Sequence, residues 1–158
     1  MTKRWGYVVM GTVLSMATLV VVAVRSSAAR ADDDDGHPRF NNRSIKGFWG
    51  FASPVSYVVP PAAPQPVPFV ALGRIFFDGE GGCTVENVVN FSGQVFKFKS
   101  ATCRYNVTPD GFGTSNADFP DAPVPGPVPL SFIIVDHGRE LRAINTNFIV
   151  GSFSATRQ

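Results

Sequence analysis

The chain has 158 residues, 44% of them hydrophobic, which is enough for one domain with a substantial core. Its formal net charge of +2 depends on four basic residues within the first 31 positions, where no acidic residue occurs; the rest has ten basic and twelve acidic side chains. This balance gives no support for a nucleic-acid-binding protein. The two cysteines, Cys83 and Cys103, have no histidine near them in the sequence, which leaves too few ligands for a zinc site, and we expect no metal or cofactor.

The first 31 residues have the pattern of a secretory signal peptide. Lys3 and Arg4 precede an uncharged run over 5–24, and the small-x-small sequence at 29–31 is typical of cleavage before Asp32. Cleavage predicts a secreted or periplasmic protein. The apolar run is almost long enough to span a bilayer, so an uncleaved anchor is the alternative, and this segment is the expected contact with a membrane.

An acidic segment follows the predicted cleavage site. Four consecutive aspartates at 32–35 precede Gly36, His37 and Pro38. An isolated run of acids lacks the fixed geometry that calcium sites use, so we interpret 32–43 as a disordered, solvated tail. The remaining residues, 44–158, are the predicted folded domain.

Alternating apolar and polar residues recur along this domain and predict β-strands. The expected strands cover 44–53, 69–77, 83–91, 95–107, 112–119, 130–135, 140–145 and 148–156. Two proline-rich segments, 54–68 and 120–129, are interpreted as stiff, extended loops. No segment shows the periodicity of an amphipathic helix. Eight consecutively joined strands predict an all-β fold, a single antiparallel up-and-down barrel, with a β-sandwich as the alternative.

The strand over 69–77 indicates which of its faces is interior. Every second residue from Phe69 to Phe77 is apolar or small, whereas Arg74 belongs to the opposite face. A buried arginine would need a charged partner, so we expect the arginine face to point outward.

The two cysteines can be placed relative to the turn at Ser92 and Gly93. Residue numbers paired across an antiparallel hairpin have a constant sum, so folding about Gly93 places Cys83 opposite Cys103, apart from any bulge. Directly opposed residues have the Cβ separation that a disulfide needs. Two independent thiols are the alternative, but predicted export favours a Cys83–Cys103 disulfide.

The connections differ between the two ends of the predicted barrel, because successive connections in a meander alternate between the ends. Short turns that contain Asp and Gly, at 78–82, 108–111 and 136–139, fall at one end. Both proline-rich loops fall at the other end, together with the turns at 92–93 and 145–147. Loops at one end of a rigid β scaffold often form binding sites, and proline lowers the entropy cost of ordering them. The alternative is that they are ordinary surface loops.

Two resemblances accompany this pattern. Gly47-Phe48-Trp49, together with Arg157, resembles the Gly-x-Trp and terminal-arginine pairing of calycins, the lipocalin and avidin group. That resemblance implies a tryptophan that closes the barrel base with a basic side chain packed across it. The segments 69–81, 103–107 and 132–141 resemble a group of small exported bacterial proteins of unknown function. This second resemblance implies a compact β fold and an envelope or secreted location.

No arrangement of residues in the sequence predicts a catalytic site. His37 lies in the predicted tail and His137 in a predicted turn, and neither is near a candidate nucleophile. We therefore predict a non-catalytic barrel that binds a small apolar ligand at the end with the proline-rich loops. The candidates for pocket wall or core are Trp49, Phe69, Tyr105 and Phe132.

Three alternatives remain open from the sequence. The barrel could be solidly filled and serve as an envelope structural or protein-interaction module. It could be an isomerase or cyclase-type enzyme that uses a barrel cavity, by analogy of fold alone. An outer-membrane barrel is disfavoured, because the chain ends in Arg157-Gln158 and charges fall on both faces of several strands.

Overall fold

The computed structural model describes residues 40–158, except residue 125. The predicted signal peptide, 1–31, and residues 32–39 of the predicted tail lie outside the described residues. None of the helices within the described part has the length and apolar character needed to cross a bilayer. The described elements are η1 (Asn42–Ile45), β1 (Gly47–Ala52), β2 (Ser56–Val58), β3 (Val67–Phe77), β4 (Cys83–Phe91), β5 (Gln94–Lys99), β6 (Thr102–Val107), β7 (Phe112–Asp118), β8 (Val128–Val135), η2 (Asp136–Gly138), β9 (Glu140–Asn145), β10 (Ile149–Val150) and β11 (Ser152–Arg157).

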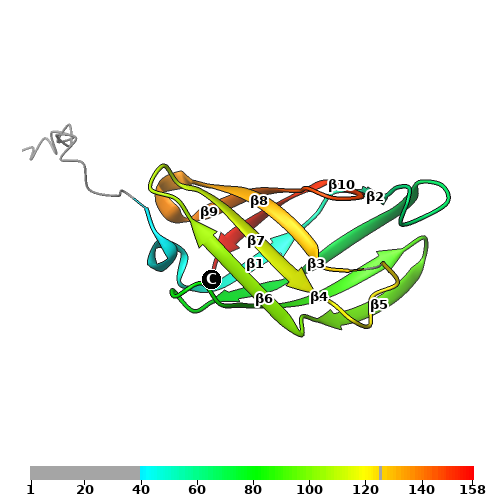
Figure 1. Cartoon of the computed structure of the whole chain (residues 1–158), viewed down its shortest axis with the longest axis horizontal. Coiled ribbons are helices and arrows are strands. Elements are labelled where there is room, and N and C mark those ends of the chain that lie inside the picture. Colours follow the sequence, from blue (N-terminus) through cyan, green and yellow to red (C-terminus); the bar gives the residue numbers. More distant parts are fainter. Residues whose placement is uncertain (1–39, 125) are drawn as a thin grey trace, which may run out of the picture. The chain divides into compact units, whose positions relative to one another are not determined.

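These elements confirm the predicted fold class: an all-β, strongly curled antiparallel sheet that forms a small, partly open barrel (Figure 1). β1 and β2 pair with successive parts of β3, and β11 and β10 pair with β1 and β2, so each couple acts as one interrupted strand. When β5 and β6 are also taken as one interrupted strand, eight strands follow each other as a meander and the last pairs with the first. Within the described residues, β5 pairs with β4 but not with β7, and β6 pairs with β7 but not with β4. The barrel is therefore open where the chain passes from β5 to β6.

A corner divides the strand that we expected over 95–107. Ser100 donates its N–H to the Val85 carbonyl oxygen, but its hydroxyl rather than its own carbonyl accepts the Val85 N–H, at 2.9 Å. The next residue, Ala101, donates its N–H to Asp118 instead of to β4. The chain therefore leaves β4 and continues as β6 beside β7, because the serine hydroxyl replaces a backbone partner at the corner.

The first proline-rich segment is shorter than the loop expected over 54–68. β2 forms between Pro54 and Pro60 and pairs with β3 on one side and β10 on the other. Pro68 lies inside β3, where its carbonyl oxygen accepts the N–H of Ser92. A proline can occupy a strand where no neighbouring strand needs the N–H group that proline lacks. The length of the loop is therefore set by where its prolines fall relative to the hydrogen bonds of the sheet.

The connections separate between the two ends as the alternation predicts (Figure 1). At the end with the tight turns, Ile134 donates its N–H to the carbonyl oxygen of Gly111, and Arg157 donates to Arg139. Near the other end, Thr146 donates to Pro129 beside the second proline-rich segment. We call these the closed end and the proline end.

Helix η1 covers the closed end. Asn41 caps it, and the Oδ1 atom of Asn42 accepts the Val107 N–H at 2.8 Å. Asn42 and Arg43 were assigned to the predicted tail, but here they belong to a helix that is hydrogen-bonded to the barrel. Ile45, the last residue of this helix, is fully buried.

Candidate ligand-binding cavity

Trp49 occupies the centre of the closed end. Its side chain is fully buried, and its indole N–H donates to the Ile45 carbonyl oxygen at 2.7 Å. The Arg157 guanidinium carbon lies 5.0 Å from the centre of the Trp49 ring, and the same guanidinium donates to the Ser44 carbonyl oxygen at 2.6 Å. A cation over an aromatic face is attracted by the ring electrons. Trp49 therefore lies in the core. It does not line the cavity that is described below.

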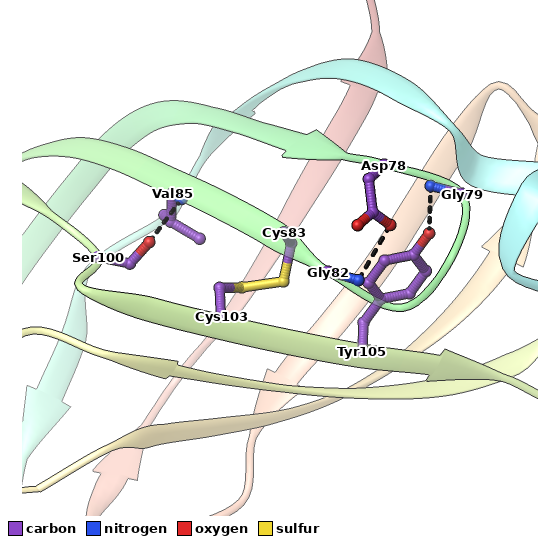
Figure 2. Close-up of a disulfide and its surroundings, with 8 residues drawn as sticks. All are labelled: Asp78, Gly79, Gly82, Cys83, Val85, Ser100, Cys103 and Tyr105. Atoms are coloured by element: carbon purple, nitrogen blue, oxygen red, sulfur yellow. Dashed lines mark hydrogen bonds between the residues drawn. A yellow bond between two sulfur atoms is a disulfide. The ribbon is translucent and has the colours of Figure 1, made fainter.

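Tyr105 and Phe132 also belong to the core of the closed end. The Tyr105 hydroxyl accepts the Gly79 N–H at 2.9 Å, as Figure 2 shows, and donates to the Asn42 carbonyl oxygen at 3.1 Å. Burial raises the pKa of Tyr105. Phe132 packs so closely on Gly113 that a Cβ atom there would collide with its ring. Of the four candidates for pocket wall or core, these two and Trp49 lie outside the cavity described below.

The disulfide joins β4 to β6, and its presence confirms the predicted pairing (Figure 2). Cys83 and Cys103 have an S–S distance of 2.00 Å and a Cα–Cα distance of 4.8 Å. The hairpin itself pairs Phe91 with Gln94, a register that would place residue 102 opposite Cys83. The corner at Ser100 adds one residue, so Gly82 faces Arg104 and the cysteines become opposed. A disulfide is consistent with an oxidising, exported location.

A cavity of about 120 Å³ lies inside the barrel, between the disulfide and the proline end. Phenylalanines from β1, β3, β4, β5 and β11 line it, together with aliphatic residues of the neighbouring strands. The second proline-rich segment contributes Ala122, Val124 and Val128, whereas no residue of the loop between β2 and β3 is among the lining residues. An apolar cavity of about 150 Å³ can stay dry and bind benzene, so this one has room for a single ring or a short branched chain.

Phe69 is the predicted pocket residue that lines this cavity, and it begins a chain of aromatic contacts. Its ring centre lies 5.2 Å from that of Phe91, which lies 6.1 Å from Phe96. Phe96 in turn stacks on Phe98 at 5.9 Å. These four side chains are only partly buried, so apolar surface remains uncovered at this end. Phe91 and Phe98 were not among the predicted pocket residues, although both lie at alternate positions of predicted strands.

One buried polar atom in the lining has no hydrogen-bond partner among the described residues. The Ser53 hydroxyl accepts the Ala71 N–H at 2.8 Å, and the Ser56 hydroxyl donates to the Pro54 carbonyl oxygen at 3.2 Å. By contrast, the Asn87 Oδ1 atom is the buried side-chain polar atom that lacks a hydrogen-bond partner among the described residues. Most buried polar groups in native proteins are paired, and leaving one unpaired costs about 1–3 kcal/mol. Asn87 alternates with Val85 and Val89 on the interior face of β4, a pattern visible in the sequence but not singled out.

The charged side chains of Arg74 and His137 lie outside the cavity. Arg74 and Lys99 both contact Glu86 on the outer face, at 2.7 and 3.1 Å, and the hydrogen bond from Arg74 lowers the pKa of Glu86. His137 is exposed in the turn after β8. Within residues 40–158, apart from 125, no cluster of His, Cys, Asp and Glu has the composition of a metal site.

Comparison with known proteins found no matching family model, no matching curated protein and no matching solved structure. The resemblances to calycins and to small exported bacterial proteins therefore stay predictions.

Proposed function

We propose that this chain is an exported, non-catalytic binding protein that holds one small apolar molecule inside the barrel, at the proline end. The observation that carries the proposal is the apolar cavity of about 120 Å³, which is bordered by the partly exposed rings of Phe69, Phe91 and Phe98. Covering such rings with an apolar ligand is favourable by about 25 cal/mol per Å² of apolar surface removed from water.

The chemistry of the cavity lining supports binding over proton-transfer catalysis. Apart from the disulfide, the lining side chains in the described part are apolar residues, serines and the amides Asn87 and Asn145. General acid–base catalysis needs a group that titrates near the working pH, and none of these side chains does so. The N-terminal pattern of 1–31 and the Cys83–Cys103 disulfide support a secreted or periplasmic location for this binding activity.

Native mass spectrometry of the protein purified gently from its own host is the first test. We expect a second species whose mass exceeds that of the apo chain by on the order of 100 Da, since a cavity of this size accepts a benzene-sized molecule. A ligand that exchanges quickly could escape during purification. The second test is therefore titration with benzene, followed by the methyl NMR resonances of Ile75, Val85 and Val89, which line the cavity.

A matched pair of variants on one strand separates cavity binding from surface adsorption. Ala71→Phe places a ring in the cavity and should abolish the benzene-induced shifts, whereas Leu72→Phe adds the same ring to the exposed face of β3 and should preserve them. Equal binding by both variants, or the absence of any binding by the wild type, would refute the proposal.

A further inference from the structure

The position of Asn87 suggests which polar group the ligand carries. Asn87 lies in the middle of β4, paired with Gly73 on β3 and with Phe98 on β5. A Cβ atom at Gly73 would come 2.9 Å from the Asn87 Cβ atom and would collide with the Glu86 carbonyl oxygen. The two strands therefore approach closely here, and Gly73 presents no side chain that could cover the Asn87 amide.

Among the described residues, the Oδ1 atom of Asn87 has no hydrogen-bond partner. The interior neighbours on its own strand are Val85 and Val89, and Phe98 faces it across β5. Two serines of the same lining, Ser53 and Ser56, already hydrogen-bond with the backbone.

We propose that the ligand is a small neutral alcohol or phenol whose hydroxyl group pairs with Asn87 while its hydrocarbon part contacts the phenylalanines; this inference rests on the proposed function. A hydroxyl both donates and accepts, so it can satisfy either end of an amide. A charged ligand does not fit, because the lining residues include no Asp, Glu, Lys, Arg or His to compensate for its lost hydration. The cavity of about 120 Å³ limits the ligand to roughly one ring, as in phenol.

The test compares phenol with toluene, which have similar shape but differ in the hydroxyl group. Both are titrated into the full chain, with its disulfide formed, and into the variants Asn87→Leu and Asn145→Leu, and the dissociation constants are obtained from methyl NMR shifts. In Asn87→Leu we expect phenol to weaken relative to toluene by up to about tenfold, the effect of one neutral hydrogen bond. Asn145→Leu, which changes another asparagine of the lining, should leave the ratio unchanged.

The outcomes separate the two proposals. If wild type binds both probes and Asn87→Leu leaves their ratio unchanged, or if Asn145→Leu changes it as much, the role of Asn87 is refuted while the cavity remains a binding site. If wild type binds neither probe, both proposals are refuted. Should Asn87→Leu fail to fold, the side-chain amide resonances of Asn87 in the wild type decide the question. Phenol must shift them more than toluene does, and equal shifts refute the role of Asn87.

Discussion

The closed end and the proline end of the barrel use aromatic residues in opposite ways. At the closed end, Trp49 and Tyr105 are buried, and each polar atom of their side chains has a hydrogen-bond partner. At the proline end, Phe69 and Phe91 have no polar atom to satisfy and keep part of their rings uncovered around a cavity. The same sheet thus provides a rigid base and an incompletely filled opening.

The difference between the ends follows from what covers each of them. Helix η1, tight turns and the C-terminal strand cover the closed end and contribute Ile45, Arg157 and the backbone groups that pair with Trp49 and Tyr105. The proline end has two long connections: the one between β7 and β8 contributes Phe119, Ala122 and Val124 to the cavity, and the one between β2 and β3 contributes no lining residue. Space remains at this end because only one of the two long connections reaches the cavity and because proline limits how such a connection can collapse.

The largest expected effect comes from truncating the central tryptophan of the closed end. Trp49→Ala should lower the free energy of unfolding by about 3–5 kcal/mol, since it empties a fully buried site and removes the partner of Arg157. Phe69→Ala, at the proline end, should cost only about 1–2 kcal/mol, since its ring is partly exposed already. Urea unfolding measures both. Equal losses would show that the two ends do not differ in packing.

The next effect concerns the disulfide between β4 and β6, which lies on the closed-end side of the cavity. Replacing both Cys83 and Cys103 by alanine should destabilise the fold by about 3 kcal/mol, because the disulfide closes a loop with a sequence separation of 20. Chemical denaturation of the double variant, and of wild type with and without reductant, measures this loss. The double variant should be insensitive to reductant. A wild type with two free thiols before reduction would contradict the pairing.

A smaller loss is expected from removing one hydroxyl at the closed end. Tyr105→Phe leaves the Gly79 N–H and the Asn42 carbonyl oxygen without their partner and should cost about 1–3 kcal/mol. Tyr57→Phe is the control, because Tyr57 is 42% exposed, and its loss should stay within about 0.5 kcal/mol. Thermal unfolding compares the two variants. A loss for Tyr57→Phe as large as that for Tyr105→Phe would argue against a structural role for the buried hydroxyl.

The smallest expected effect is a dependence of stability on pH in the turn beside Tyr105. Asp78 accepts the N–H groups of Glu80 and Gly82 at 2.7 and 2.9 Å, and the hydrogen bond from Glu80 is the main cause that lowers its pKa below 3.8. Because the pKa is lower in the folded state, this carboxylate stabilises the fold above about pH 4, and the contribution is lost as the pH falls through the folded value. Asp78→Asn should therefore lose less stability than wild type between pH 6 and 2 in urea titrations. Parallel pH profiles would exclude this contribution.

Local patterns in the sequence were sufficient for the outline of the fold. The alternation from Phe69 to Phe77 identified the interior face of a long strand, and the spacing of Cys83 and Cys103 about Gly93 predicted their disulfide. Both inferences depend on neighbours along one strand or across one hairpin. The chain order then determined which connections lie at the same end of the barrel, because successive connections in a meander alternate between its two ends.

The tertiary structure decided what depends on contacts between distant segments. Alternation could not show that the hydroxyl of Ser100 would replace a backbone partner and divide one predicted strand in two. Nor could it separate Trp49, which is covered by Ile45 and Arg157, from Phe69, which has no such cover and borders the cavity. The unpaired oxygen of Asn87 likewise became apparent only in the folded sheet, where its partners in the register, Gly73 and Phe98, offer it no polar side chain. Burial and hydrogen-bond satisfaction depend on how the whole sheet curls, and this is why they emerged only from the folded chain.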